Sequence, residues 1–140
     1  MIRRILLAVD DSAASLAAAR TAVEIAAATG AHVHVLHVLV DSELAAALGT
    51  HDGDRQVTGA ETLLAHVSRL AVAAGVPVRS ECAAGEPARC VLDRARALPA
   101  DLVVIGSAGR RGPGQPYVGH HTQHILEFAE WPVLTVPAPA

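Results

Sequence analysis

The residues with the clearest capacity for chemistry lie between Gly106 and Gly119, where glycines at 106, 109 and 119 follow the spacing Gly-x2-Gly-x9-Gly. A glycine at a strand end lets the backbone approach a ligand closely, because it has no Cβ. Gly119, just before a predicted helix, would leave backbone N–H groups facing a phosphate, and the helix dipole favours that charge. The segment therefore predicts a phosphate-binding loop, with a surface turn rich in glycine and proline as the alternative.

Three histidines follow this loop in the pattern His120-His121-x2-His124, at the start of a predicted helix. His120 and His124 lie one helical turn apart and could both ligate Zn²⁺. A zincin hydrolase would need Glu after the first histidine, where this chain has His121. Because a zinc site needs more ligands than one histidine pair supplies, we interpret these residues as solvated or phosphate-facing and expect no metal site.

Further polar candidates lie near the ends of predicted strands. Asp10 follows the first strand, and its carboxylate either contacts a ligand or caps the next helix. Arg110 either reaches a phosphate or is solvated in its loop. Ser107 lacks the Gly-x-Ser-x-Gly elbow of a hydrolase nucleophile. The histidines near the second strand are interpreted as polar positions at strand ends rather than as a site, with His32 and His34 on one face and His37 on the other.

Short apolar runs alternate with helical patterns and would position these candidates. The predicted strands are residues 5–9, 33–40, 76–82, 102–105 and 133–136, and Pro77 indicates an edge position for the third. The predicted helices run from an Asp10-Asp11-Ser12 N-cap to Thr29, and over 60–74, 87–97 and 122–129. Residues Asp41 to Thr58 are expected to form an irregular, mobile surface loop with one helical turn at Ser42–Leu48.

This alternation predicts a single α/β domain over residues 1–140, with a five-stranded, doubly wound parallel sheet. In such sheets ligands bind beyond the carboxyl ends of the strands, where the strand order reverses. If the first and fourth strands are neighbours, Asp10 and Gly106 flank that crevice. The topology therefore places a ligand site at these two residues.

Amino-acid composition argues against nucleic acids and membranes as partners. A net charge of −3 and an aromatic content of 2% argue against nucleic-acid binding, which uses basic surfaces and stacking rings. No apolar stretch approaches the roughly 20 residues of a membrane span, and no signal peptide is recognisable. We expect a soluble cytoplasmic protein in which the two cysteines, Cys82 and Cys90, are reduced.

Several segments, in order, resemble those of the universal stress protein family. They are the opening strand with its Asp10-Asp11-Ser12 turn, His37-Val38, Gly85-Glu86-Pro87, Asp101 to Ser107, the glycine spacing, and Ala129 to Val136. The resemblance covers the whole chain. It implies a flavodoxin-like (Rossmann-like) sheet of the adenine nucleotide alpha hydrolase-like group, and a homodimer paired through the last strand, Val133-Val136.

In one branch of the family the resemblance also implies binding of ATP or AMP, with Mg²⁺ as a possible companion. Asp10 and Val38 would lie near the adenine and ribose, and Ala8 and Val9 would also belong to the cofactor site. Residues that cradle the phosphates would be Gly106, Ser107, Gly109, Arg110, Gly119, His120, His121 and Thr122. The alternatives are a dimeric interaction module that binds no nucleotide, acting through its dimer surface and the 41–58 loop, and a weak ATPase, for which the sequence offers no general base.

The phosphate segment departs from the family pattern at one important position. His120 stands where the family has Ser or Thr, whose hydroxyl donates to a phosphate oxygen. Thr122 matches a second hydroxyl position and could compensate. Pro113, Gly114 and Pro116 also replace a turn that is commonly basic and rich in leucine. The sequence therefore leaves open whether nucleotide binding is retained.

Overall fold

A computed structural model of the chain describes residues 1–39, 50–107 and 120–139, and for residues 50–58 it describes the backbone only. The strands of this described part form one parallel sheet in the order β3-β2-β1-β4-β5. The strands are β1 Arg4–Ala8, β2 His32–Leu39, β3 Val78–Ala84, β4 Leu102–Gly106 and β5 Val133–Val136. The helices are α1 Ala13–Thr29, α3 Thr50–Ala73, α4 Pro87–Ala97 and α5 His120–Phe128. The predicted doubly wound α/β fold is confirmed.

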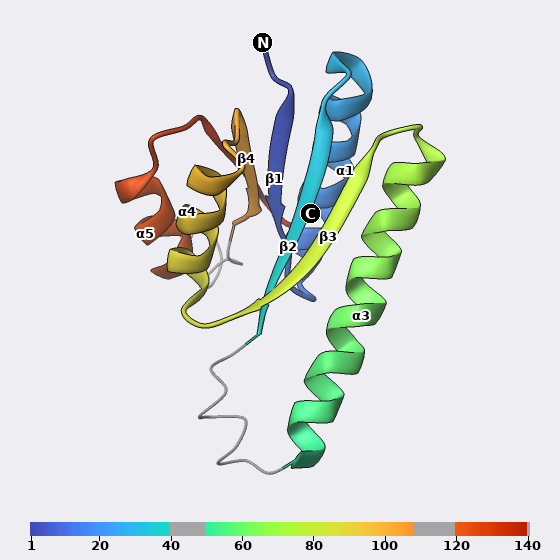
Figure 1. Cartoon of the computed structure of the whole chain (residues 1–140), viewed down its shortest axis with the longest axis vertical. Helices are drawn as coiled ribbons and strands as arrows, with labels where there is room; N and C mark the ends of the chain where they lie inside the picture. Colours follow the sequence, from blue (N-terminus) through green and yellow to red (C-terminus); the bar gives the residue numbers. More distant parts are fainter. Residues whose placement is uncertain (40–49, 108–119, 140) are drawn as a thin grey trace.

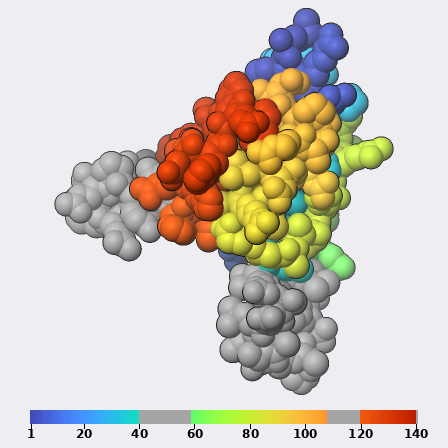
Figure 2. Space-filling view, turned by 60° about the vertical axis from the view of Figure 1, so that its left-hand side comes forward, coloured from blue at the N-terminus to red at the C-terminus, as the bar shows by residue number. Residues whose placement is uncertain are grey.

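Helices cover the sheet from both sides, with α1 and α3 on one face and α4 and α5 on the other (Figure 1). Figure 2 shows the surfaces of α4 and α5 side by side on their face. Along β1, Ile5 and Leu7 pack towards α1 and α3, and Leu6 packs towards α4 and α5. All three side chains are fully buried. A strand buried on both faces must be apolar at every position, which explains the uninterrupted apolar run.

Small residues bring α1 unusually close to the sheet. Ala18, Ala19 and Ala22 are fully buried on its inner face. At Gly106, the last residue of β4, an added Cβ would lie 2.7 Å from the carbonyl carbon of Ala14 and from the backbone nitrogen of Ser15. The end of β4 therefore packs directly against the first turn of α1, and only glycine fits between the two backbones.

Two local predictions are wrong. α3 begins at Thr50 rather than near Ala60, so residues 50–58 are helical and not irregular. Gly53 and Gly59 each lower the stability of a helix by only about 1 kcal/mol. Because helix extension is cooperative and α3 is anchored on the sheet, this cost does not end the helix. Within the predicted Asp10-Asp11-Ser12 N-cap, Ser12 caps α1, since its Oγ accepts from the backbone N–H of Ser15, and only the capping role considered for Asp10 is wrong. The turn predicted at 42–48 lies outside the described residues.

Other boundaries move by a few residues. β3 begins at Val78 and reaches Ala84, β4 includes Gly106, and α5 begins at His120. The edge position predicted for the third strand is confirmed, because in the part of the chain that the structure describes β3 pairs on one side only, with β2. No helix in the described ranges combines the length and the apolar character needed to cross a bilayer.

Gly106→Ala tests the close packing of β4 on α1. The new methyl group must displace the α1 backbone, so we expect the free energy of unfolding to fall by about 1–3 kcal/mol. Gly59→Ala is the matched control, because an added Cβ there meets nothing within 4 Å and removing a helical glycine should stabilise by about 0.5–1 kcal/mol. Urea unfolding monitored by circular dichroism measures both. Equal effects in the two variants would contradict the packing argument.

Candidate functional site

A pocket lies at the carboxyl ends of β1 and β4, where the strand order reverses. β1 pairs with β2 on one side and with β4 on the other. The first and fourth strands are therefore neighbours, as a ligand crevice between Asp10 and Gly106 requires. The pocket encloses about 170 Å³, and its lining comes from β1, α1, β2, α4, β4 and α5. The lining residues are Ala8, Val9, Asp10, Ser15, Leu36, Val38, Pro87, Val91, Ile105, Gly106, His121, Thr122 and Ile125.

The Asp10 carboxylate is held in place by the first turn of α1. Its Oδ1 accepts from the backbone N–H of Ser12 and from the Ser15 hydroxyl, both at 2.8 Å. The Asp10 N–H in turn donates to Ser15 Oγ at 2.9 Å. Burial raises the pKa of Asp10, but the hydrogen bonds from Ser12 and Ser15 and the charge of His37 together bring this pKa below its ordinary value. The pocket therefore has a fixed, ionised carboxylate on its β1 side.

His37 supports the end of β1 from the neighbouring strand. Its Nδ1 lies 2.8 Å from the carbonyl oxygen of Val9. Because a carbonyl only accepts, this nitrogen carries a hydrogen. The contact fixes the main chain directly before Asp10 and adds to the precision with which that carboxylate is placed.

The first turns of α4 and α5 meet beside the pocket. Glu86 caps α4, accepting from the N–H groups of Ala88 at 3.1 Å and Arg89 at 2.8 Å. The same carboxylate lies 3.1 Å from Nδ1 of His121 on α5. Burial raises the pKa of Glu86, yet these backbone bonds and His121 bring it below its usual range. Glu86 thus joins the two helix starts, and Thr122, the residue after His121, is buried.

The structure brings together seven of the residues predicted from the sequence. They are Ala8, Val9, Asp10, Val38, Gly106, His121 and Thr122. Ser107 is not among the lining residues, and its hydroxyl donates to the Val136 carbonyl at 3.3 Å. His120 is exposed, its ring centroid lies 5.8 Å from that of His121, and it borders a separate shallow pocket. Gly109, Arg110 and Gly119 lie outside the described residues.

Some lining residues were not anticipated from the sequence, namely Ser15, Leu36, Pro87, Val91, Ile105 and Ile125. Ser15 had a readable signal, because it is a polar residue on the alanine-rich, buried face of α1. The apolar residues had none, since core and pocket side chains share the same periodicity. Within the described ranges, no three or more His, Cys, Asp or Glu side chains are arranged to hold a metal ion.

The sequence profile of the universal stress protein family matches residues 1–137. The chain belongs to the universal stress protein family. It is 32% identical over 139 residues to a universal stress protein of Thermus aquaticus, the one encoded in the QAH/OAS sulfhydrylase 3′ region, with 97% of this chain and 99% of the relative covered. It is 29% identical to universal stress protein MJ0531 of Methanocaldococcus jannaschii, with 99% of this chain and 84% of the relative covered.

Solved structures show that the universal stress protein fold extends over the whole chain. Hypothetical protein MJ0577 superposes with a TM-score of 0.83 at 19% identity, covering 100% of this chain and 99% of that one. A universal stress protein in complex with cAMP superposes at 0.75 with 21% identity, covering 99% and 98%. The Archaeoglobus fulgidus protein in complex with dAMP superposes at 0.71 with 21% identity, covering 97% and 98%.

The network around Asp10 predicts a pH dependence of stability in this universal stress protein. A carboxyl whose pKa is lower in the folded than in the unfolded state stabilises the fold above its unfolded pKa, near 3.8, and this contribution disappears as the pH falls through the folded value. Asp10→Asn should therefore unfold more easily than wild type at pH 7, and the difference should shrink below pH 4. Asp11→Asn removes the same charge beside α1 and is the control. Thermal melts from pH 2 to 7 measure this difference. The same pH dependence of the melting temperature in Asp10→Asn and Asp11→Asn would contradict the prediction.

Proposed function

We propose that this universal stress protein binds an adenine nucleotide, AMP or ATP, in the pocket between the carboxyl ends of β1 and β4. The observation that carries the proposal is the convergence of Asp10, Gly106 and Thr122 on one pocket at the strand-order reversal. These residues come from segments far apart in the chain. Relatives with the same fold have been solved with cAMP and dAMP, which supports an adenine nucleotide as the ligand.

The pocket offers an apolar side for a base and a carboxylate for polar recognition. Leu36, Val38 and Val91 contribute the apolar surface. The two described hydrogen bonds of the Asp10 carboxylate both use Oδ1. Its Oδ2 is then the atom that accepts from an adenine amino group or a ribose hydroxyl, while Oδ1 keeps the side chain in position.

The start of α5 supplies the groups suited to phosphate. Its first backbone N–H groups have no intrahelical partner, and the helix dipole favours an anion there. Thr122 adds a buried hydroxyl and His121 a ring that is oriented by Glu86. The spacing of Gly109, Arg110 and Gly119 assigns these residues to the same phosphate site in our proposal. Ser107 and His120 are assigned there by sequence position alone.

We also propose a homodimer formed through β5. Among the described strands, this one is at the edge of the sheet and pairs only with β4. An edge strand presents unpaired backbone N–H and C=O groups, which a second copy can pair with. The side chains of Val133, Leu134 and Val136 are half-buried, so dimerisation would cover apolar surface that the single chain leaves partly open.

Nucleotide binding is tested by thermal stabilisation and isothermal titration with AMP and ATP, each with and without Mg²⁺. A hundredfold excess over Kd should stabilise the fold by about 2.7 kcal/mol. Thr122→Val and Asp10→Ala should weaken binding about tenfold or more, because each removes a polar partner of the ligand. Asp11→Ala is the charge-matched control and should bind as wild type. No response to millimolar nucleotide would reject the proposal and favour the dimeric interaction module.

His120→Ser restores the hydroxyl that the family has at this position. If His120 limits phosphate binding, the Ser variant should bind ATP about tenfold more tightly than wild type, while AMP affinity changes less because fewer phosphates are involved. His124→Ser, one helical turn further along α5, controls for loss of a histidine. Unchanged ATP affinity in His120→Ser would show that this position does not limit binding.

A further inference from the structure

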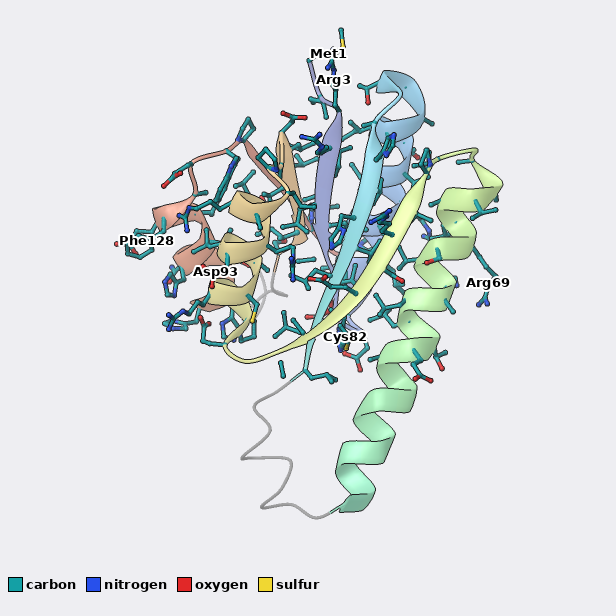
Figure 3. The ribbon with its side chains drawn as sticks, viewed as in Figure 1. Met1, Arg3, Arg69, Cys82, Asp93 and Phe128 are labelled. Atoms are coloured by element: carbon teal, nitrogen blue, oxygen red, sulfur yellow. The ribbon has the colours of Figure 1, made fainter. Side chains whose placement is uncertain are left out.

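A second pocket lies at the opposite end of the sheet, among the amino ends of β1, β2 and β3. The strands run from the end marked by Met1 and Arg3 towards the pocket described above (Figures 1 and 3). This second pocket encloses about 390 Å³, more than twice the volume at the carboxyl ends. Its lining residues are Arg4, Ile5, His32, Val33, His34, Pro77, Val78, Arg79 and Leu98.

Sheet register places four nitrogen-bearing side chains of this pocket on one face. Arg4 is level with His32 across β1 and β2, and His34 is level with Arg79 across β2 and β3. Residues two apart on a strand point to the same side, and here it is the side of Leu6 and α4. With strands about 4.8 Å apart, the array from β1 to β3 is about 10 Å wide. Its polar groups are two guanidinium groups and two imidazoles.

Glu81 lies 3.7 Å from His34 and partly offsets the positive charge of this array, but the two guanidinium groups have no direct ion pair among the described residues. Arg4 and Arg79 make no ion pair with a carboxylate within the described ranges, whereas Arg94 pairs with Glu81. Asp101 lies near Arg4, but its Oδ2 accepts from the backbone N–H groups of Arg3 at 2.9 Å and Arg4 at 3.0 Å. The pocket therefore combines a concave shape with two guanidinium groups that make no ion pair within the described ranges, in a chain whose net charge is −3.

His34 has an acidic neighbour, Glu81, but makes no good hydrogen bond with it. Its Nε2 is 3.7 Å from Glu81 Oε2, longer than the roughly 2.7–3.2 Å of a good hydrogen bond. This nitrogen is shielded from solvent and has no hydrogen-bond partner among the described residues. Burial lowers the pKa of His34, Glu81 opposes that effect, and the charges of Arg94 and Arg79 add to the lowering. The negative charge of an anion bound in the pocket would favour the protonated form of His34.

We propose that this amino-end pocket binds a small oligophosphate, held by Arg4, His32, His34 and Arg79. Guanidinium groups match phosphate oxygens in a bidentate geometry, and imidazoles donate single hydrogen bonds. Two guanidinium groups placed two strands apart suit a ligand whose charge is spread over several phosphate groups. The site is separate from the proposed nucleotide pocket, and neither depends on the other.

The test is isothermal titration with sodium tripolyphosphate at low ionic strength, since exposed charges are screened by salt. Arg4→Gln and Arg79→Gln should each weaken binding about tenfold. Arg69→Gln removes the same charge from α3, where the side chain points away from the sheet (Figure 3), and should bind as wild type. Thermal melts of all variants verify folding.

NMR spectra of the histidine rings give a second readout. The ring signals of wild-type His34 should change when tripolyphosphate is added, and the ring should lose its proton at a higher pH when the ligand is bound.

Other anions and the variants distinguish a specific oligophosphate site from an unspecific basic surface and from binding at the carboxyl-end pocket. Orthophosphate and citrate should each bind at least tenfold more weakly than tripolyphosphate; equal binding of all three would mean an unspecific basic surface and would overturn the proposal. Wild-type affinity in both Arg4→Gln and Arg79→Gln would also overturn it. If Thr122→Val loses tripolyphosphate binding instead, the anion occupies the carboxyl-end pocket. Saturating AMP should leave tripolyphosphate affinity unchanged, whether or not the nucleotide proposal holds.

Discussion

The direct contact between the end of β4 and the first turn of α1 is the constraint on which the carboxyl-end pocket depends. Gly106 leaves no room for a Cβ against the backbone of Ala14 and Ser15. This contact brings the Asp10–Ser15 network of β1 and α1 beside the last residue of β4. A larger residue at the β4 end would separate the two walls of the pocket. Gly106, which the glycine spacing assigns to a phosphate-binding loop, therefore also has a packing role.

The two ends of the sheet differ in the kind of polar group that they present. At the carboxyl ends, helix starts offer backbone N–H groups, together with the fixed carboxylate of Asp10. At the amino ends, strand side chains such as Arg4 and Arg79 provide the positive charge. Parallel strands produce this difference because all helices that follow a strand begin at the same edge. The helices end at the other edge with unpaired carbonyl groups, so positive charge there must come from side chains.

The fold tolerates wide sequence variation, whereas the site depends on a few contacts. Structures only 19–21% identical to this chain superpose over nearly all of it. Buried positions in β1 and α1 need only apolar residues of suitable size, which many sequences supply. By contrast, the Glu86–His121 contact joins residues 35 positions apart and has specific geometry. Ligand choice within the family is therefore expected to follow such contacts rather than the fold.

The sequence by itself determined the strands, the doubly wound topology and the family, because buried parallel strands and glycine spacings are local patterns. It also indicated that Asp10 and Gly106 would flank a ligand crevice if the first and fourth strands were neighbours. Only the tertiary structure decided that Asp10 bonds to Ser15 while Ser12 caps α1, and that α3 begins at Thr50. It alone assembled Arg4, His34 and Arg79 into one pocket. These outcomes depend on strand register and helix packing, which join residues that are distant in the chain and that no local pattern relates.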